Sequence, residues 1–277
     1  MAAKTITEEE LEEIYAFAIQ LGKDAGNLLM QAAHSRFSSR SNDASHEHDK
    51  STTAQEFTQK DSAVDIVTQT DEDVEAFIKT AINARYPSHA FIGEETYAKS
   101  SQPTRPYLVT PTTPTWVVDP LDGTVNYTHL FPMFCASIAF LIDGVPVIGV
   151  ICAPMLGQLF TACKGRGAWL NETQRLPLVR QPMPKNAPGG CVFSCEWGKD
   201  RKDRPEGNLY RKVESFVNMA AEVGGRGGKG GMVHGVRGLG RSVFVPSEIA
   251  SWWFLICELL TLRQRNFGPR LYGNGLL

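Results

Sequence analysis

Two apolar runs in residues 134–154 constrain the fold more than any other feature of this sequence. The runs FCASIAFLI and VPVIGVICAP flank Asp143 and Gly144. An Asp-Gly pair between two apolar runs is the pattern of a β-hairpin with a two-residue turn. Residues 157–171, GQLFTACKGRGAWLN, continue with a second strand–turn–strand pattern. The sequence therefore predicts a sheet that contains consecutive antiparallel strands.

Helical patterns alternate with strand patterns before these hairpins. Thr7 and Glu10 have the spacing of a capping box. The long amphipathic helix that follows has an apolar stripe at Leu11, Ile14, Ala18, Leu21, Ala25, Leu28 and Ala32. Residues 63–71 predict a strand, and Thr70 is expected to cap the next helix. That helix has apolar positions at Val74, Phe77, Ile78, Ala81 and Ile82. The alternation predicts an α/β chain with mixed or antiparallel sheets.

Residues 34–60 separate these two helical patterns and are rich in Ser, Thr, Asn, Gln, His and charged residues. A segment of this composition buries too little apolar surface to order itself. We therefore expect a mobile polar insertion over residues 34–60.

Overall composition excludes several classes of partner. The 277 residues are 42% hydrophobic, which supports a sizeable core, and the net charge is −2. That balance favours neither nucleic acid nor an anionic membrane. The six cysteines include no C-x-x-C pair, as expected of free thiols in a reducing compartment. The acidic start, MAAKTITEEELEE, lacks the apolar core of a secretory signal. We expect a cytoplasmic protein with no nucleic-acid or membrane partner.

Two aspartates end the apolar segment of residues 116–127, WVVDPLDGTVNY. Pro120 is expected to end a strand after Asp119 and to leave the carbonyl of Leu121 free, with Asp122 following. A carboxylate, a carbonyl and a second carboxylate are hard oxygen ligands of the kind that Mg²⁺ binds. Glu94, at the end of another predicted strand, could complete the cluster.

The next two residues extend this pattern toward phosphate. Gly123 and Thr124 are expected to open a helix or tight turn whose N–H groups can hold a phosphate oxygen. The segment then indicates a phosphate-ester site with metals between protein and substrate. The alternative is an ordinary turn, because Asp, Pro and Gly are the favoured turn residues. On these residues alone both interpretations stay open.

The longer string WVVDPLDGTVNYTHLFP, residues 116–132, closely resembles the signature of the inositol monophosphatase family of magnesium-dependent, lithium-sensitive sugar phosphatases. VDIVTQTD (64–71) and YPSHAFIGEE (86–95) resemble the two upstream motifs of that family, in the same order. The resemblance continues to about residue 240. It implies the layered α-β-α-β-α sandwich of the sugar phosphatases over residues 1–240. Because the family is commonly homodimeric, it also suggests a homodimer.

The resemblance also implies a role for each site residue. Glu94, Asp119 and the Leu121 carbonyl would hold one Mg²⁺, and Asp119 and Asp122 would contribute to a second. Asp71 would support a third, weaker site through water, although an acid in the first turn of a helix is also stabilised by the helix dipole alone.

The substrate contacts follow in the same way. Asp122, Gly123 and Thr124 would lie at the phosphate, and Thr124 and Glu94 would orient and deprotonate the attacking water. The implied activity is magnesium-dependent hydrolysis of inositol monophosphate or a similar small phosphorylated polyol, by in-line attack of metal-activated water.

The resemblance stops near residue 240, and residues 241–277 form an atypical tail. Family members carry a further aspartate in a later Trp-Asp motif, whereas Asp203 is the last aspartate of this sequence. We therefore expect a fold whose C-terminal part is truncated or replaced, and we hypothesise that the tail reflects a frameshift, a retained intron or a wrong gene model. The alternative function is a catalytically defective relative with at most a binding role. On this basis the chain is expected to be poorly stable and weakly active or inactive.

Overall fold

The computed structural model describes residues 6–41, 57–59, 66–99, 113–178, 184–195, 197 and 200–237. The predicted tail, residues 241–277, and most of the predicted polar insertion lie outside this part of the chain. The division at residue 240 therefore stays a prediction.

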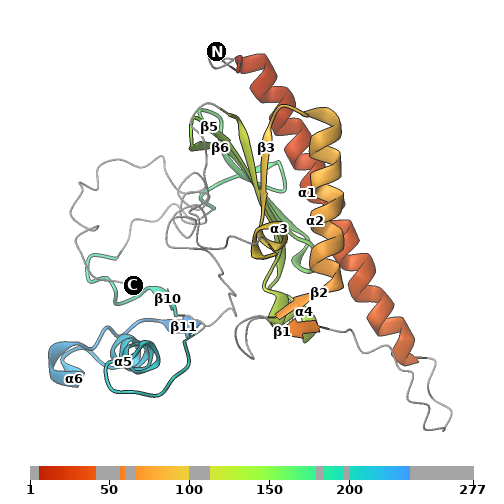
Figure 1. The fold of residues 1–277 in the computed structure, drawn as a ribbon. Coiled ribbons are helices and arrows are strands. Elements are labelled where there is room, and N and C mark those ends of the chain that lie inside the picture. Colours follow the sequence, from red (N-terminus) through yellow and green to blue (C-terminus); the bar gives the residue numbers. More distant parts are fainter. Residues whose placement is uncertain are drawn as a thin grey trace, which may run out of the picture.

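One seven-stranded sheet, in the order β3-β4-β5-β6-β7-β8-β9, forms the centre of the molecule (Figure 1). Its strands are β3 (Ala90–Gly93), β4 (Thr115–Asp122), β5 (Cys135–Ile142), β6 (Val145–Ala153), β7 (Gln158–Cys163), β8 (Gly167–Leu170) and β9 (Gln174–Arg175). The pair β3–β4 is parallel and the other neighbours are antiparallel. The two hairpins predicted from residues 134–154 and 157–171 are confirmed as β5–β6 and β7–β8.

Two long helices, α1 (Glu8–Ser41) and α2 (Gln69–Arg85), lie side by side against this sheet (Figure 1). The predicted capping box is confirmed. The Thr7 N–H donates to Glu10 Oε2 at 3.0 Å, and the Glu10 N–H donates to Thr7 Oγ1 at 3.1 Å. The buried stripe follows the prediction from Ile14 to Ala25 and then continues through Leu29 and Ala33 rather than Leu28 and Ala32, while Leu11 is partly buried. Alternating steps of three and four have a period of about 3.5 residues, whereas an α-helix has about 3.6 residues per turn. The predicted stripe therefore drifts around the helix, away from the buried face.

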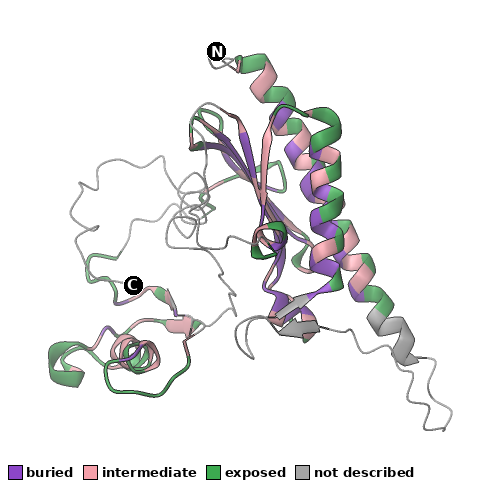
Figure 2. Ribbon diagram, viewed as in Figure 1, coloured by how far each residue is buried: buried purple, intermediate pink, exposed green. Residues whose placement is uncertain are grey.

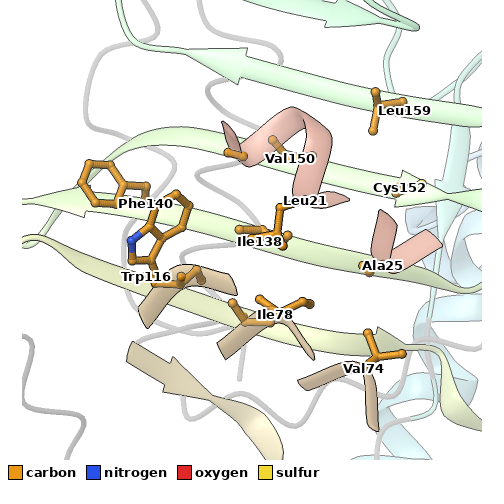
Figure 3. Close-up of a cluster of buried hydrophobic side chains, with 14 of the residues drawn as sticks. Leu21, Ala25, Val74, Ile78, Trp116, Ile138, Phe140, Val150, Cys152 and Leu159 are labelled. Carbon is orange, nitrogen blue, oxygen red and sulfur yellow. The ribbon is translucent and has the colours of Figure 1, made fainter. Parts of the chain in front are cut away.

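The core lies between these helices and the sheet (Figures 2 and 3). Figure 3 shows Leu21 and Ala25 from α1 and Val74 and Ile78 from α2 pointing toward the strands. From the strands they meet Trp116, Ile138, Phe140, Val150, Cys152 and Leu159. One predicted core position is wrong: Phe77 is 37% exposed. Successive residues of a helix are rotated by about 100°, so Phe77 is turned out of the face that buries Ile78.

The remaining elements are short. They are β1 (Phe57–Gln59), β2 (Ile66–Thr68), α3 (Glu94–Ala98), α4 (Thr124–Thr128), η1 (Pro154–Leu156), β10 (Val192–Ser194), α5 (Asn208–Ala220), α6 (Gly225–Gly228) and β11 (Gly235–Arg237). In Figure 1 the group formed by β10, β11, α5 and α6 lies apart from the large sheet. The architecture is therefore the predicted mixed α/β fold, with a central sheet and flanking helices.

Three predicted boundaries are wrong. The polar insertion does not begin at residue 34, because α1 continues to Ser41. Near the other end of the predicted insertion, residues 57–59 form β1. The cap of α2 is Thr68 rather than Thr70. The strand β4 does not end at Asp119 but continues through Pro120 to Asp122. In the described part of the chain, no helix has the length and apolar character needed to span a membrane.

Candidate active site

The parallel pair β3–β4 brings two acid-bearing turns to one edge of the sheet. Gly93, the last residue of β3, lies opposite Val118 of β4. Because the strands are parallel, their carboxyl ends point the same way. Glu94 therefore follows β3 at the same edge at which β4 carries Asp119 and ends with Asp122. Figure 1 shows the two turns, α3 and α4, that leave these strands.

The end of β4 is irregular where the two aspartates lie. Asp119 pairs with Ser137 and Asp122 pairs with Cys135, so three steps on β4 oppose two on β5. This is the geometry of a β-bulge, which tolerates Pro120 because one residue leaves the ladder. The Leu121 N–H donates to Asp119 Oδ1 at 3.2 Å. The bulge, and not the end of the strand, directs the two aspartates.

Thr124 begins α4 and is buried among predicted site residues. Its hydroxyl lies 3.1 Å from Asp71 Oδ1 and 3.1 Å from the carbonyl oxygen of Leu121. The expectation that the Leu121 carbonyl is free is therefore wrong, because that oxygen can accept from Thr124. A carbonyl oxygen has two lone pairs, so a second partner remains possible. Gly123 caps α4 at a left-handed φ of 87°, a conformation that glycine adopts without strain.

Asp71 links α2 to this turn. Its Oδ2 accepts from the Thr68 N–H at 2.9 Å, which is one half of a capping box for α2, and also from the Thr68 hydroxyl at 2.5 Å. The side chain is 2% exposed. Burial, with a smaller contribution from the charge of Glu95, raises the pKa of Asp71 to about 6, against the lowering effect of the hydrogen bonds from Thr68 and Thr124. Asp71 has a capping role and a place in the site at once.

Asp119 lies at the electrostatic centre of the cluster. Burial raises the pKa of Asp119 well above its ordinary value, and the charges of Glu94, Asp122 and Asp71 raise it further. A hydrogen bond with the side chain of Glu94 acts in the same direction. Four carboxyl groups within mutual influence repel one another when ionised, and a divalent cation would relieve that repulsion. The donor set therefore fits a hard cation.

The acids do not form a ready-made metal site. Across the described residues, no three His, Cys, Asp or Glu side chains are grouped so that they would hold a metal ion. The side chains of Asp119 and Glu94 instead form a hydrogen bond with each other. The four acids share one electrostatic neighbourhood, and their assignment as ligands stays a prediction.

Sequence reasoning missed the buried side chain of Glu75. Its carboxylate accepts from the N–H groups of Glu95 and Thr96, both at 2.7 Å, and from the Thr96 hydroxyl. Glu95, the residue after Glu94, is also buried. The signal in the sequence is a single acid at a core-facing position of α2, one turn after Asp71.

Comparison with known proteins defines the class. The model of the inositol monophosphatase family matches residues 10–244. The chain therefore belongs to the inositol monophosphatase family and is a phosphatase of that superfamily.

Particular relatives are similar to different extents. "Quinic acid degradation cluster protein x" of Neurospora crassa is 81% identical over 258 residues, which cover 91% of this chain and 75% of that protein. "Inositol monophosphatase 2" of Saccharomyces cerevisiae is 37% identical over 194 residues, 69% of this chain and 60% of that protein. The solved structure of the extragenic suppressor protein suhB from Bartonella henselae has a TM-score of 0.59 at 23% identity, covering 83% of this chain and 71% of that one. This likeness supports the fold.

Proposed function

We propose that this chain is a magnesium-dependent phosphomonoesterase that hydrolyses inositol monophosphate or a similar small phosphorylated polyol. The observation that carries the proposal is the neighbourhood of Asp119, in which four carboxyl groups interact electrostatically and one of them, Asp71, contacts the buried hydroxyl of Thr124. The family membership supplies the reaction class, and family members are metal-dependent.

The cation ligands in this proposal are oxygens at the ends of β3 and β4. Glu94, Asp119 and the Leu121 carbonyl would hold one Mg²⁺, Asp119 and Asp122 a second, and Asp71 a weaker third through water. When bound, the cations would lower the pKa of a water and neutralise charge on the leaving oxygen. The hydrogen-bond acceptors of the site are all hard oxygens, which matches this metal rather than a softer one.

The side chains of the protein orient the water and the phosphate. The Thr124 hydroxyl has one hydrogen, which it donates to Asp71 or to the Leu121 carbonyl, and its oxygen keeps two lone pairs. Those lone pairs can accept from the attacking water, and Glu94 can take the proton that the water loses. Asp122, Gly123 and Thr124 would contact the phosphate at the start of α4.

The names of the relatives support a more specific substrate class within this proposal. One relative is named for quinic acid degradation and others are named inositol monophosphatases. Inositol and quinic acid are both cyclohexane polyols, so a phosphate ester of a ring polyol suits both names. We therefore place the substrate in that class.

The second candidate is a catalytically defective member of the family with at most a binding role. It rests on one sequence observation, namely that no aspartate follows Asp203 in the sequence given. The distal aspartate of the resembling family would then be missing from the second cation site.

Phosphate release separates the two candidates. The purified chain would be assayed with inositol 1-phosphate and with phosphorylated quinic acid, at increasing Mg²⁺ and with a chelator. Turnover that requires Mg²⁺ and is abolished by Asp119→Asn supports the phosphomonoesterase. A folded chain that releases no phosphate above background on any ring polyol phosphate supports the defective relative. Light scattering of the same sample tests the predicted homodimer, and the cytoplasmic location stays a prediction.

A further inference from the structure

The carboxylate of Glu75 joins α2 to the turn that carries Glu94. Glu75 is 3% exposed. Its two oxygens accept three hydrogen bonds from α3, two from backbone N–H groups and one from the Thr96 hydroxyl. A buried carboxylate with three donors is well satisfied, so it forms a firm link rather than a strained one.

Glu75 acts as the missing cap of α3. The first N–H groups of a helix have no partner within it, and an Asn, Asp, Ser or Thr before the helix usually satisfies them. Here that position is Gly93, which has no side chain to offer, and the cap comes from Glu75, 20 residues before the Glu95 N–H that it accepts from. A Cβ atom on Gly93 would overlap the Glu75 carboxylate. The glycine therefore leaves the space that the distant cap occupies.

The same face of α2 holds both turns of the site. Asp71 and Glu75 are four residues apart, so they lie one above the other on one face of the helix. Asp71 contacts Thr124 at the start of α4, and Glu75 contacts the first turn of α3, directly after Glu94. The helix thus sets the distance between the two turns.

From this geometry we propose that Glu75 is a positioning residue that fixes Glu94 for cation binding. Glu75 itself contacts neither substrate nor cation. The capping role stands on the structure alone, whereas the consequence for cation binding rests on the proposed function.

The first test compares Glu75→Gln with Glu72→Gln. Glutamine keeps the size but places an NH₂ group against an N–H donor, so one cap bond is lost. Glu72 is the matched control, because its ion pair with Lys99, at 2.7 Å, joins the same two helices on the exposed side. Calorimetric titration with Mg²⁺ alone, without substrate, gives the dissociation constant. Hydrogen exchange of the Glu95 and Thr96 amides, with a chelator present, reports the cap.

We expect Glu75→Gln to weaken Mg²⁺ binding by roughly 10- to 100-fold, the range for residues that orient metal ligands. The Glu95 and Thr96 amides should exchange faster, and Glu72→Gln should change neither measurement. If the Glu95 and Thr96 amides exchange faster in Glu75→Gln but the unaltered chain binds no Mg²⁺, the capping role is supported. The cation role is then refuted together with the proposed function. A folded Glu75→Gln variant with unchanged amide exchange, or with unchanged Mg²⁺ affinity, overturns the inference itself.

A rescue variant distinguishes loss of the cap from loss of the fold. Gly93 has φ −114° and ψ 148°, which any residue adopts, so a serine can serve there as a local cap. In the unaltered chain, Gly93→Ser should be damaging because its Cβ meets the Glu75 carboxylate. Combined with Glu75→Ala the same serine should restore slow amide exchange and part of the Mg²⁺ affinity relative to Glu75→Ala alone. A double variant no better than Glu75→Ala contradicts the capping role.

Discussion

In the cation-free protein, replacement of Asp71 by asparagine should reduce the loss of folding stability that accompanies a rise from acidic to neutral pH. The pKa of Asp71 is raised from its ordinary 3.8 to about 6 in the fold, chiefly by burial. A raised pKa means that the folded state favours the protonated acid. Its stabilising contribution is present below pH 3.8 and is lost as the pH rises through 6. Asparagine is always neutral and has no such dependence.

The size of the effect follows from linkage. Between pH 4.5 and pH 7.5, the free energy of unfolding of the unaltered chain should fall by about 2 kcal/mol relative to Asp71→Asn. With a urea slope of about 2 kcal/mol per M, the difference between their midpoints should change by about 1 M. The loss of hydrogen bonds to Thr68 and Thr124 lowers the stability of the variant equally at both pH values. The change of the stability difference with pH therefore measures the effect of the Asp71 charge.

The assay is urea unfolding in the presence of a chelator at the two pH values, followed by circular dichroism. Asp73→Asn is the matched control, since Asp73 is an exposed acid on the same helix. A constant difference between Asp71→Asn and the unaltered chain at both values would refute the reasoning. Added Mg²⁺ should stabilise the unaltered chain more than the variant, which would show that the charge is retained for binding rather than for folding.

Three further results are expected. Thr124→Val should lower kcat at least tenfold while Thr124→Ser retains most of it, because only the serine keeps the buried hydroxyl, and equal rates would contradict this. Cys152 and Cys163, whose thiol pKa values burial raises to about 11, should resist iodoacetamide at pH 9 in the folded protein and react in urea, as mass spectrometry would show. Ile78→Ala should cost about 3 kcal/mol in urea unfolding, whereas Phe77→Ala should cost under about 1, and similar costs would contradict the packing of α2.

The sequence predicts those parts of the fold whose cause is local. The Asp143-Gly144 pair between apolar runs, and the Thr7–Glu10 spacing, each contain the complete signal within a few residues, and both are confirmed. Pro120 misled the prediction of β4 because a bulge accommodates it, and a bulge depends on the neighbouring strand.

The site shows the same division. The sequence indicates the acids of residues 116–124 as candidate oxygen donors, and their predicted roles come from the family resemblance. The hydrogen bond between Thr124 and Asp71, however, spans 53 residues, and that between Glu75 and Thr96 spans 21. Contacts of this kind arise only when the tertiary fold brings α2 against the turns that follow β3 and β4. Spacing along the chain cannot show them, and the role of Glu75 became visible only from the geometry.

β3, the strand before Glu94, has four residues and pairs with one neighbour in the described sheet, since it stands at the end of the order. A short border strand opens more readily than an inner one. Gentle warming should therefore open β3 and shift Glu94, while the hairpins beyond β4 stay intact. Loss of turnover would then precede the main melting transition, and cooling would reverse it.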